Sequence, residues 1–416
     1  IVGAQYLQDE EDRFELNIGF PERGVCGGQP QGACPEWNLI TDATGETDSF
    51  GIFGELAINL TDDLELTVGG RYTDDSRDLR FSTYGWGAAG GLNALGLGEG
   101  ARDCNANRIP DPLGRANQNP APGIALVCGD PINTMGFDAT ASNSWDDFSP
   151  RVSLSYAVND SSSVYALYSE GFKAGGFQQD ARNRPHLFDN LVDSEEVENI
   201  ELGWKGSFDR AIFAVTLFQM ELGNAQATVN IPAGVGSSGN VTLVRNTGGI
   251  ETTGIELEGT FAVTDNFTLG GNIASYDAEY GSGSLQGGSF DPATGTFSGE
   301  DISGTVPNNV PESTYYLFAD YVWDLSNGAS ISVRADFRHR DTVWGQAGAR
   351  NRDGLNLNGT GPMYLRPELD KIGFNIAWTN PTDTLEVSLW GRNLDDDPDF
   401  HNFGPPIGYI FSAGQQ

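Results

Sequence analysis

Hydrophobic and polar residues alternate with a period of two along much of the chain. This spacing places apolar side chains on one face of a β-strand and polar ones on the other. The segment Arg151–Val158 alternates in this way, and so does Ser162–Phe177, which runs as an aromatic strand into a glycine-rich loop. Further alternating segments begin at Phe50, Leu64, Ile255, Ile331 and Ile372. The pattern predicts an all-β protein.

Short polar turns join the predicted strands in pairs. After the first turn they recur at intervals of about 50–60 residues, which accommodates two strands and one long loop. The turns are Thr61–Asp63, Asn159–Ser161, Ser207–Asp209, Thr264–Asn266, Ser326–Gly328 and Asn380–Asp383. Segments rich in Gly, Asn, Asp and Pro predict long loops at the other strand ends. These are Phe20–Glu46, Gly85–Ser144, Gly176–Ser194, Ile231–Gly249, Gly281–Val310, Trp344–Pro362 and Asp395–Gln416.

The alternating strands fit either a soluble β-sandwich or a membrane barrel. Three features favour the barrel. The polar faces carry charges of both signs, many strands exceed about ten residues, and aromatic residues lie near strand ends, as interface girdles do. These aromatic residues are Tyr72, Tyr156, Trp204, Tyr321, Trp323 and Trp378. We therefore predict a transmembrane antiparallel β-barrel with short periplasmic turns and long extracellular loops.

Composition agrees with a barrel and narrows the possible partners. Hydrophobic residues make up 38% of the 416 residues, and no window approaches the roughly 18 consecutive apolar residues of a membrane-spanning helix. The net charge is −35, from 58 acidic and 23 basic residues, so the chain would repel nucleic acid. The excess of acidic residues is best explained by a solvated acidic surface. The alternative is that acidic loops collect cations or cationic ligands.

The four cysteines fall into two local pairs within predicted loops. Cys26 and Cys34 lie in one Gly- and Pro-rich segment, and Cys104 and Cys128 lie in another. Neither pair has the CxxC spacing of a zinc site. We predict two disulfides, Cys26–Cys34 and Cys104–Cys128, and hence an oxidising compartment. The alternative is four free buried thiols.

No group of residues predicts catalysis, a cofactor or a metal. The histidines (His186, His339 and His401) are scattered along the chain. The glycine-rich segment Gly87–Gly100 lies in a long loop, where flexibility explains it. The acidic segments Asp395–Asp399 and Asp291–Thr296 offer oxygen ligands for Ca²⁺, but neither matches an EF-hand, and solvated turns are favoured.

Basic residues near one strand end are candidates for ligand recognition. They are Arg334, Arg338, Arg340 and, on the same segment, Trp344. Arginine can hold a carboxylate or phosphate through two hydrogen bonds. Pairing with acids of neighbouring strands, such as Asp336 or Glu256, is the favoured alternative, because mixed charge is ordinary in a barrel lumen. We therefore assign no ligand-binding residues.

Several segments, in the expected order, resemble the TonB-dependent receptors of Gram-negative outer membranes. The resemblance spans essentially the whole chain. It is carried by Thr47–Glu55, Leu60–Asp63, Val68–Asp75, Trp145–Arg151, Ser162–Phe177, Glu195–Gly206, Gly254–Glu258 and Trp390–Asp396.

This resemblance implies a barrel of about 22 strands that encloses an N-terminal plug. Residues 1–416 would then be part of the barrel domain, with about 13 strands, and the plug, about eight early strands and the final strand would lie outside the chain. It implies contact with outer-membrane lipid and lipopolysaccharide, and with TonB through an N-terminal segment absent here.

The activity that the resemblance implies is TonB-energised uptake of a scarce nutrient. A ferric siderophore or similar iron complex is the first expectation, and haem, cobalamin and glycans are the others. The protein would not be an enzyme. A passive porin and a surface adhesin barrel stay open as alternatives.

Overall fold

The computed structural model describes residues 1–19, 37–87, 136–177, 192–232, 240–291, 296–345 and 365–397. These residues form one 13-stranded antiparallel sheet and three two-stranded sheets, so the predicted all-β class is confirmed. The large sheet contains, in order, β1 (Val2–Gly19), β2 (Trp37–Asn59), β3 (Leu64–Gly87), β4 (Gly136–Asn159), β5 (Ser162–Lys173), β6 (Glu195–Phe208), β7 (Ala211–Gly223), β10 (Gly249–Thr264), β11 (Phe267–Tyr280), β14 (Ser313–Asp324), β15 (Ser330–Arg340), β18 (Leu369–Thr379) and β19 (Glu386–Gly391).

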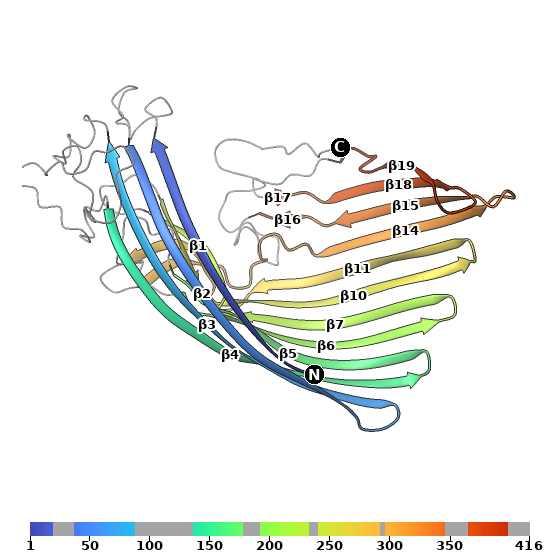
Figure 1. Cartoon of the computed structure of the whole chain (residues 1–416), viewed down its shortest axis with the longest axis horizontal. Coiled ribbons are helices and arrows are strands. Elements are labelled where there is room, and N and C mark those ends of the chain that lie inside the picture. The colour runs from blue at the N-terminus through green and yellow to red at the C-terminus, as the bar shows by residue number, and fades with distance from the viewer. Residues whose placement is uncertain are drawn as a thin grey trace, which may run out of the picture.

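The sheet curves along its width, and successive strands run in opposite directions (Figure 1). Figure 1 also shows that the short turns gather at one end of the strands, which we call the turn end. The other connections leave the opposite end, which we call the rim. The described part of the chain contains no helix that is long and apolar enough to span a membrane.

The predicted turns lie where strands meet at the turn end. In the turn after β4, the Ser161 N–H donates to Asn159 Oδ1 at 2.8 Å, an arrangement that short polar side chains favour. One predicted turn, Ser207–Asp209, is displaced, because β6 continues through Phe208 and β7 begins at Ala211. The alternating strands and the short polar segments between them therefore predicted the positions of the turns to within about two residues.

Two predicted loops are wrong in extent. β2 already begins at Trp37, within the predicted loop Phe20–Glu46. β3 continues to Gly87 and β4 begins at Gly136, so both enter the predicted loop Gly85–Ser144. These extensions are rich in Gly, Asn, Asp, Ser and Thr, which are typical of loops, although they also contain apolar residues such as Trp37 and Phe137. Backbone hydrogen bonds between neighbouring strands hold them, and such bonds do not depend on side-chain polarity.

Three small hairpins also lie at the rim, one of them wholly within a segment predicted as a loop and the other two at the borders of such segments. They are β8 (Gln226–Pro232) with β9 (Asn240–Asn246), β12 (Leu285–Asp291) with β13 (Thr296–Asp301), and β16 (Val343–Trp344) with β17 (Leu365–Arg366). Each follows one strand of the large sheet and precedes the next. β7 therefore pairs with β10, β11 with β14, and β15 with β18.

The large sheet has one apolar and one polar face. Large hydrophobic side chains on the apolar face are open to the surroundings: Leu56, Leu202 and Leu217 are 62%, 56% and 50% exposed. Register places these residues in rows, for example Leu202 opposite Leu217, and Leu217 opposite Ile255. A sheet face this apolar and this exposed needs a nonaqueous partner.

Five glutamates form a row on the apolar face, beyond its apolar belt toward the rim. The register sets Glu170 opposite Glu198, Glu198 opposite Glu221, Glu221 opposite Glu251, and Glu251 opposite Glu279. Directly opposed side chains of antiparallel strands have Cβ atoms about 5 Å apart, and like charges at this distance are destabilising. Within the described residues, Glu198, Glu221 and Glu251 have no cationic partner.

We expect Glu221→Gln to raise the free energy of unfolding by about 0.5–1 kcal/mol, because it removes the repulsion with both neighbours. The gain should shrink as salt is added, since the Debye length falls to about 3 Å at 1 M. Thermal unfolding followed by circular dichroism at several salt concentrations measures both effects. The matched control is Glu258→Gln, because Glu258 stands opposite Ala214 and Asn272. A lower midpoint for Glu221→Gln would contradict the repulsion.

Candidate functional site

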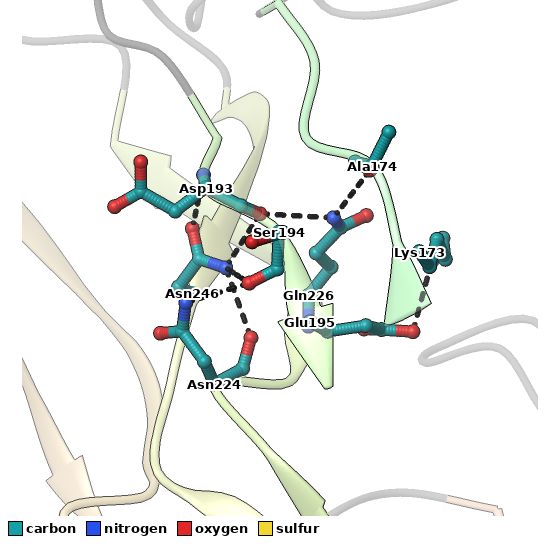
Figure 2. A network of polar contacts seen from close by, with 8 residues as sticks. All are labelled: Lys173, Ala174, Asp193, Ser194, Glu195, Asn224, Gln226 and Asn246. Carbon is teal, nitrogen blue, oxygen red and sulfur yellow. Dashed lines mark hydrogen bonds and ion pairs between the residues drawn. The ribbon is translucent and has the colours of Figure 1, made fainter. Parts of the chain in front are cut away.

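The candidate site is the rim, where the chain leaves the large sheet and returns to it. A polar network joins four segments of the chain there (Figure 2). We call it the rim network. Its members come from the end of β5, the segment before and into β6, the segment after β7 and into β8, and the end of β9. They are Lys173, Ala174, Asp193, Ser194, Glu195, Asn224, Gln226 and Asn246.

The side chain of Asn246 is the centre of the rim network. Its Oδ1 accepts a hydrogen bond from the Asp193 N–H at 2.7 Å. Its Nδ2 donates to the Asp193 carbonyl oxygen and to the Asn224 carbonyl oxygen, each at 2.9 Å. One amide therefore holds the end of β9 to the chain before β6 and to the chain after β7. Asn224 has a positive φ of 53°, which turns the backbone between β7 and β8.

Gln226 extends the rim network to β5. Its Nε2 donates to the carbonyl oxygens of Ala174 and Asp193, both at 3.0 Å. Its backbone N–H donates to Glu195 Oε2 at 2.7 Å, while Glu195 Oε1 lies 3.2 Å from Lys173 Nζ. The Gln226 amide nitrogen and Glu195 Oε2 thus bond to backbone groups of other segments, which fixes where the chain leaves the rim.

A small apolar cluster lies beside the network and anchors the chain after β5. It consists of Ala43, Leu79, Trp145, Ala174 and Phe177. The rings of Trp145 and Phe177 are 6.0 Å apart in an edge-on arrangement, and the Arg77 guanidinium lies 5.9 Å from the Trp145 ring. Beyond the cluster, Gly176 and Val192 exchange two backbone hydrogen bonds of 2.9 Å. We call the chain that leaves the large sheet at the rim after one strand and returns with the next strand an excursion. These two hydrogen bonds close the base of the excursion between β5 and β6.

The rim hairpins are also held to each other. Ser284 and Thr305 are 0% and 1% exposed, and the Ser284 hydroxyl accepts from the Gly249 N–H at 3.2 Å. The Leu285 N–H donates to Thr247 Oγ1 at 2.8 Å. Arg245, on β9, donates to the Leu285 carbonyl oxygen at 3.0 Å, and its burial lowers the pKa of the guanidinium. These contacts join the chain between β7 and β10 to the chain between β11 and β14, and together with the rim network they form what we call the collar, which runs from the end of β5 to the segment after β11.

The basic residues noted in the sequence lie on the polar face of β15 and pair with acids. Arg334 Nε is 3.0 Å from Asp320 Oδ1, and its guanidinium lies 4.2 Å from the Phe318 ring. Arg338 stacks 5.0 Å from the Tyr316 ring, and its Nε is 3.8 Å from an Asp336 oxygen. The cross-strand partner is Asp320 of β14, whereas Asp336, named in the prediction, lies on β15 itself and contacts Arg338 along the same strand.

The remaining candidates have backbone partners. Arg340 donates to the Pro367 carbonyl oxygen at 3.2 Å, and the Trp344 carbonyl oxygen accepts from the Asn309 N–H at 2.7 Å. Glu256 accepts a hydrogen bond of 3.4 Å from the Tyr276 hydroxyl. None of these contacts identifies a ligand.

The acidic segment after β19 has a structural use. Asp397 Oδ2 accepts from the Asp370 N–H at 2.8 Å, and Asp395 Oδ1 accepts from the Ile372 N–H at 3.4 Å. Both carboxylates thereby satisfy backbone donors of β18 beyond the end of β19. Within the described ranges, no three His, Cys, Asp or Glu residues are grouped as metal ligands.

Several predicted features lie outside the described residues. These are Cys26, Cys34, Cys104 and Cys128, the glycine-rich segment Gly87–Gly100 beyond its first residue, and two histidines, His186 and His401. The disulfides therefore stay predictions. The remaining histidine, His339, has its Nδ1 2.6 Å from Asp370 Oδ1 and stacks 4.2 Å from the Tyr315 ring.

Comparisons with known proteins identify the fold family. The ferric yersiniabactin uptake receptor FyuA of Yersinia pestis is 14% identical, with a TM-score of 0.59; the match covers 97% of this chain and 52% of that one. The siderophore receptor PiuA of Acinetobacter baumannii is 17% identical with a TM-score of 0.59, and the match covers 96% of this chain and 49% of that one. The chain thus spans about half the length of these receptors.

The search of curated proteins found no match. The sequence model of one family, described as TonB dependent receptor-like, beta-barrel, matches residues 3–394. Proteins of this family are receptors and transporters of the Gram-negative outer membrane. The chain belongs to the TonB-dependent receptor β-barrel family.

Proposed function

We propose that the protein is an outer-membrane receptor that takes up a scarce nutrient with energy from TonB, and that this nutrient is a ferric siderophore or a similar iron complex. The observation that carries this proposal is the family match over residues 3–394. The names of FyuA and PiuA, which share the fold, support iron as the cargo.

The two faces of the sheet support a placement in the membrane. The apolar face, with Leu56 and Leu202 exposed, contacts lipid, and the polar face, with Arg334 and Arg338, lines the lumen. We place the turn end in the periplasm and the rim outside the cell, among lipopolysaccharide. Residues 1–416 are then part of one barrel domain, and TonB contacts a segment outside them.

The rim suits a receptor because it fixes the points from which outward loops project. The collar ties the bases of successive excursions through Asn246, Gln226 and Ser284. Loops held on a rigid scaffold are the usual carriers of binding residues. A passive porin and an adhesin barrel are less well supported, because the family match is to receptors. We propose no enzymatic activity.

Uptake measurements test this function. The full-length gene, expressed in a Gram-negative strain that lacks its own siderophore receptors, should restore growth on one or more ferric siderophores as the iron source. Accumulation of radioactive iron should disappear when TonB is deleted or the proton gradient is dissipated. Uptake that persists without TonB would contradict the receptor and favour a porin. Restoration by cobalamin or a glycan instead of iron would contradict the cargo alone.

A further inference from the structure

The apolar face carries a furrow that runs along β5. Its floor is Val164 and Ala166, which stand between larger residues of the neighbouring strands. In one row Ala166 lies opposite Leu154 on β4 and Leu202 on β6. In the next row toward the turn end, Val164 lies opposite Tyr156 and Trp204. The furrow has a volume of about 440 Å³.

The furrow is continuous with the surface that contacts lipid. Its walls belong to the exposed apolar belt, with Leu154 42% and Leu202 56% exposed. Ala166 is smaller than Leu154 and Leu202, its neighbours on the adjacent strands. The apolar surface is therefore lower along β5 than along β4 and β6. In a membrane, an apolar hollow of this kind is filled by a hydrocarbon chain, because neither water nor a polar group gains by entering it.

Two hydrogen-bond donors flank the turn end of the furrow. Tyr156 lies three residues before the end of β4, and Trp204 lies four residues before the end of β6. Within the described part of the chain, neither the Tyr156 hydroxyl nor the Trp204 indole N–H has a hydrogen-bond partner. Tyrosine and tryptophan donors at a membrane interface reach the polar oxygens of lipids.

The other end of the furrow is negatively charged. The hydroxyl of Tyr168, in the next row beyond Ala166, donates to Glu170, and Glu170 stands opposite Glu198. A phosphate would be repelled there, whereas at the turn end it would meet the two donors. The headgroup therefore belongs at the turn end, in the leaflet nearest the turns.

From these contacts we infer that the furrow binds one acyl chain of a glycerophospholipid, and that Tyr156 and Trp204 donate to its ester or phosphate oxygens. The lipid is held by a shaped site and is distinct from the lipids that surround the whole barrel. This inference depends on the placement of the apolar face in the membrane and is independent of which nutrient is carried.

Native mass spectrometry of the full-length protein, delipidated in detergent and then titrated with phosphatidylethanolamine, tests the inference. The wild type should bind one lipid more tightly than the rest. Ala166→Leu fills the furrow and should weaken that first binding step about tenfold. The matched control is Ala335→Leu, because Ala335 lies on the apolar face of β15, opposite Ala319 and Phe374, outside the furrow. It should bind lipid as the wild type does.

A second pair of variants keeps the furrow open. Tyr156→Phe retains the ring and removes the hydroxyl, and Trp204→Phe keeps an aromatic side chain without the indole N–H, so the first phospholipid should bind more weakly while the fold is unchanged. Equal binding by wild type and Ala166→Leu, or a random distribution of bound lipids, would overturn the inference. So would selective retention of lipopolysaccharide over phosphatidylethanolamine. Iron uptake by Ala166→Leu should match the wild type, so failure of the lipid site is distinguishable from failure of the proposed function.

Discussion

Gly175→Ala should destabilise the base of the β5–β6 excursion by about 3 kcal/mol, because there is no space for a Cβ atom. A Cβ on Gly175 would lie 2.0 Å from the Val192 carbonyl oxygen and 2.3 Å from Trp145 Nε1. Val192 is 2% exposed and Trp145 is 8% exposed, so neither can move without losing packing. The paired hydrogen bonds between Gly176 and Val192 should therefore break first.

Hydrogen exchange measured by mass spectrometry on the detergent-solubilised protein checks this prediction. A loss of 3 kcal/mol corresponds to exchange about a hundredfold faster at the amides of Gly176 and Val192. Gly176→Ala is the matched control, since its Cβ would meet only Arg77 Nη1, at 3.5 Å. If the two alanine variants exchange at the same rate, the packing of Trp145 against Gly175 is not what closes the excursion.

Gly175 also shows which part of the fold could be predicted from the sequence. The alternation in Ser162–Phe177 indicates a strand that ends at a glycine-rich loop, and β5 does end at Lys173. Glycine is required at position 175 by the Val192 carbonyl oxygen and by Trp145 on β4, neither of which is near it in the sequence. The local alternation of apolar and polar residues predicts the strand. Contacts with residues distant in the sequence determine which side chains position 175 can accommodate.

The extent of the rim could not be predicted for a related reason. The rim ends of β2, β3 and β4 are rich in Gly, Asn, Asp, Ser and Thr, so they resemble loops in composition even though they pair as strands. The rim network could not be predicted from the sequence either. Asn246 and Gln226 donate to backbone carbonyl oxygens, and because every residue has a carbonyl group the sequence does not mark the partners. Hairpin order and turn positions were predictable because they depend on neighbours in the chain.

Asn246→Asp should cost about 2 kcal/mol, because a carboxylate can only accept hydrogen bonds. The bond from the Asp193 N–H would survive, but both 2.9 Å bonds from Nδ2, to Asp193 and Asn224 carbonyl oxygens, would be replaced by repulsion between oxygens. We expect a lower thermal midpoint and faster exchange around residues 192–195 and 224–226. Asn375→Asp is the matched control, since Asn375 is exposed and its side chain makes no hydrogen bond among the described residues.

The pattern of exchange distinguishes a shared collar from a local contact. Gln226 donates to both Ala174 and Asp193, so a disturbance of Asp193 in Asn246→Asp should also reach the chain after β5. Faster exchange at residues 174–177 in this variant would show that the β5–β6 and β7–β10 excursions are held as one unit. If exchange rises only beside Asn224, in the same excursion as Asn246, each excursion is anchored separately. Loops that receive a ligand on one excursion would then be free to move without the others, and the collar would not coordinate them.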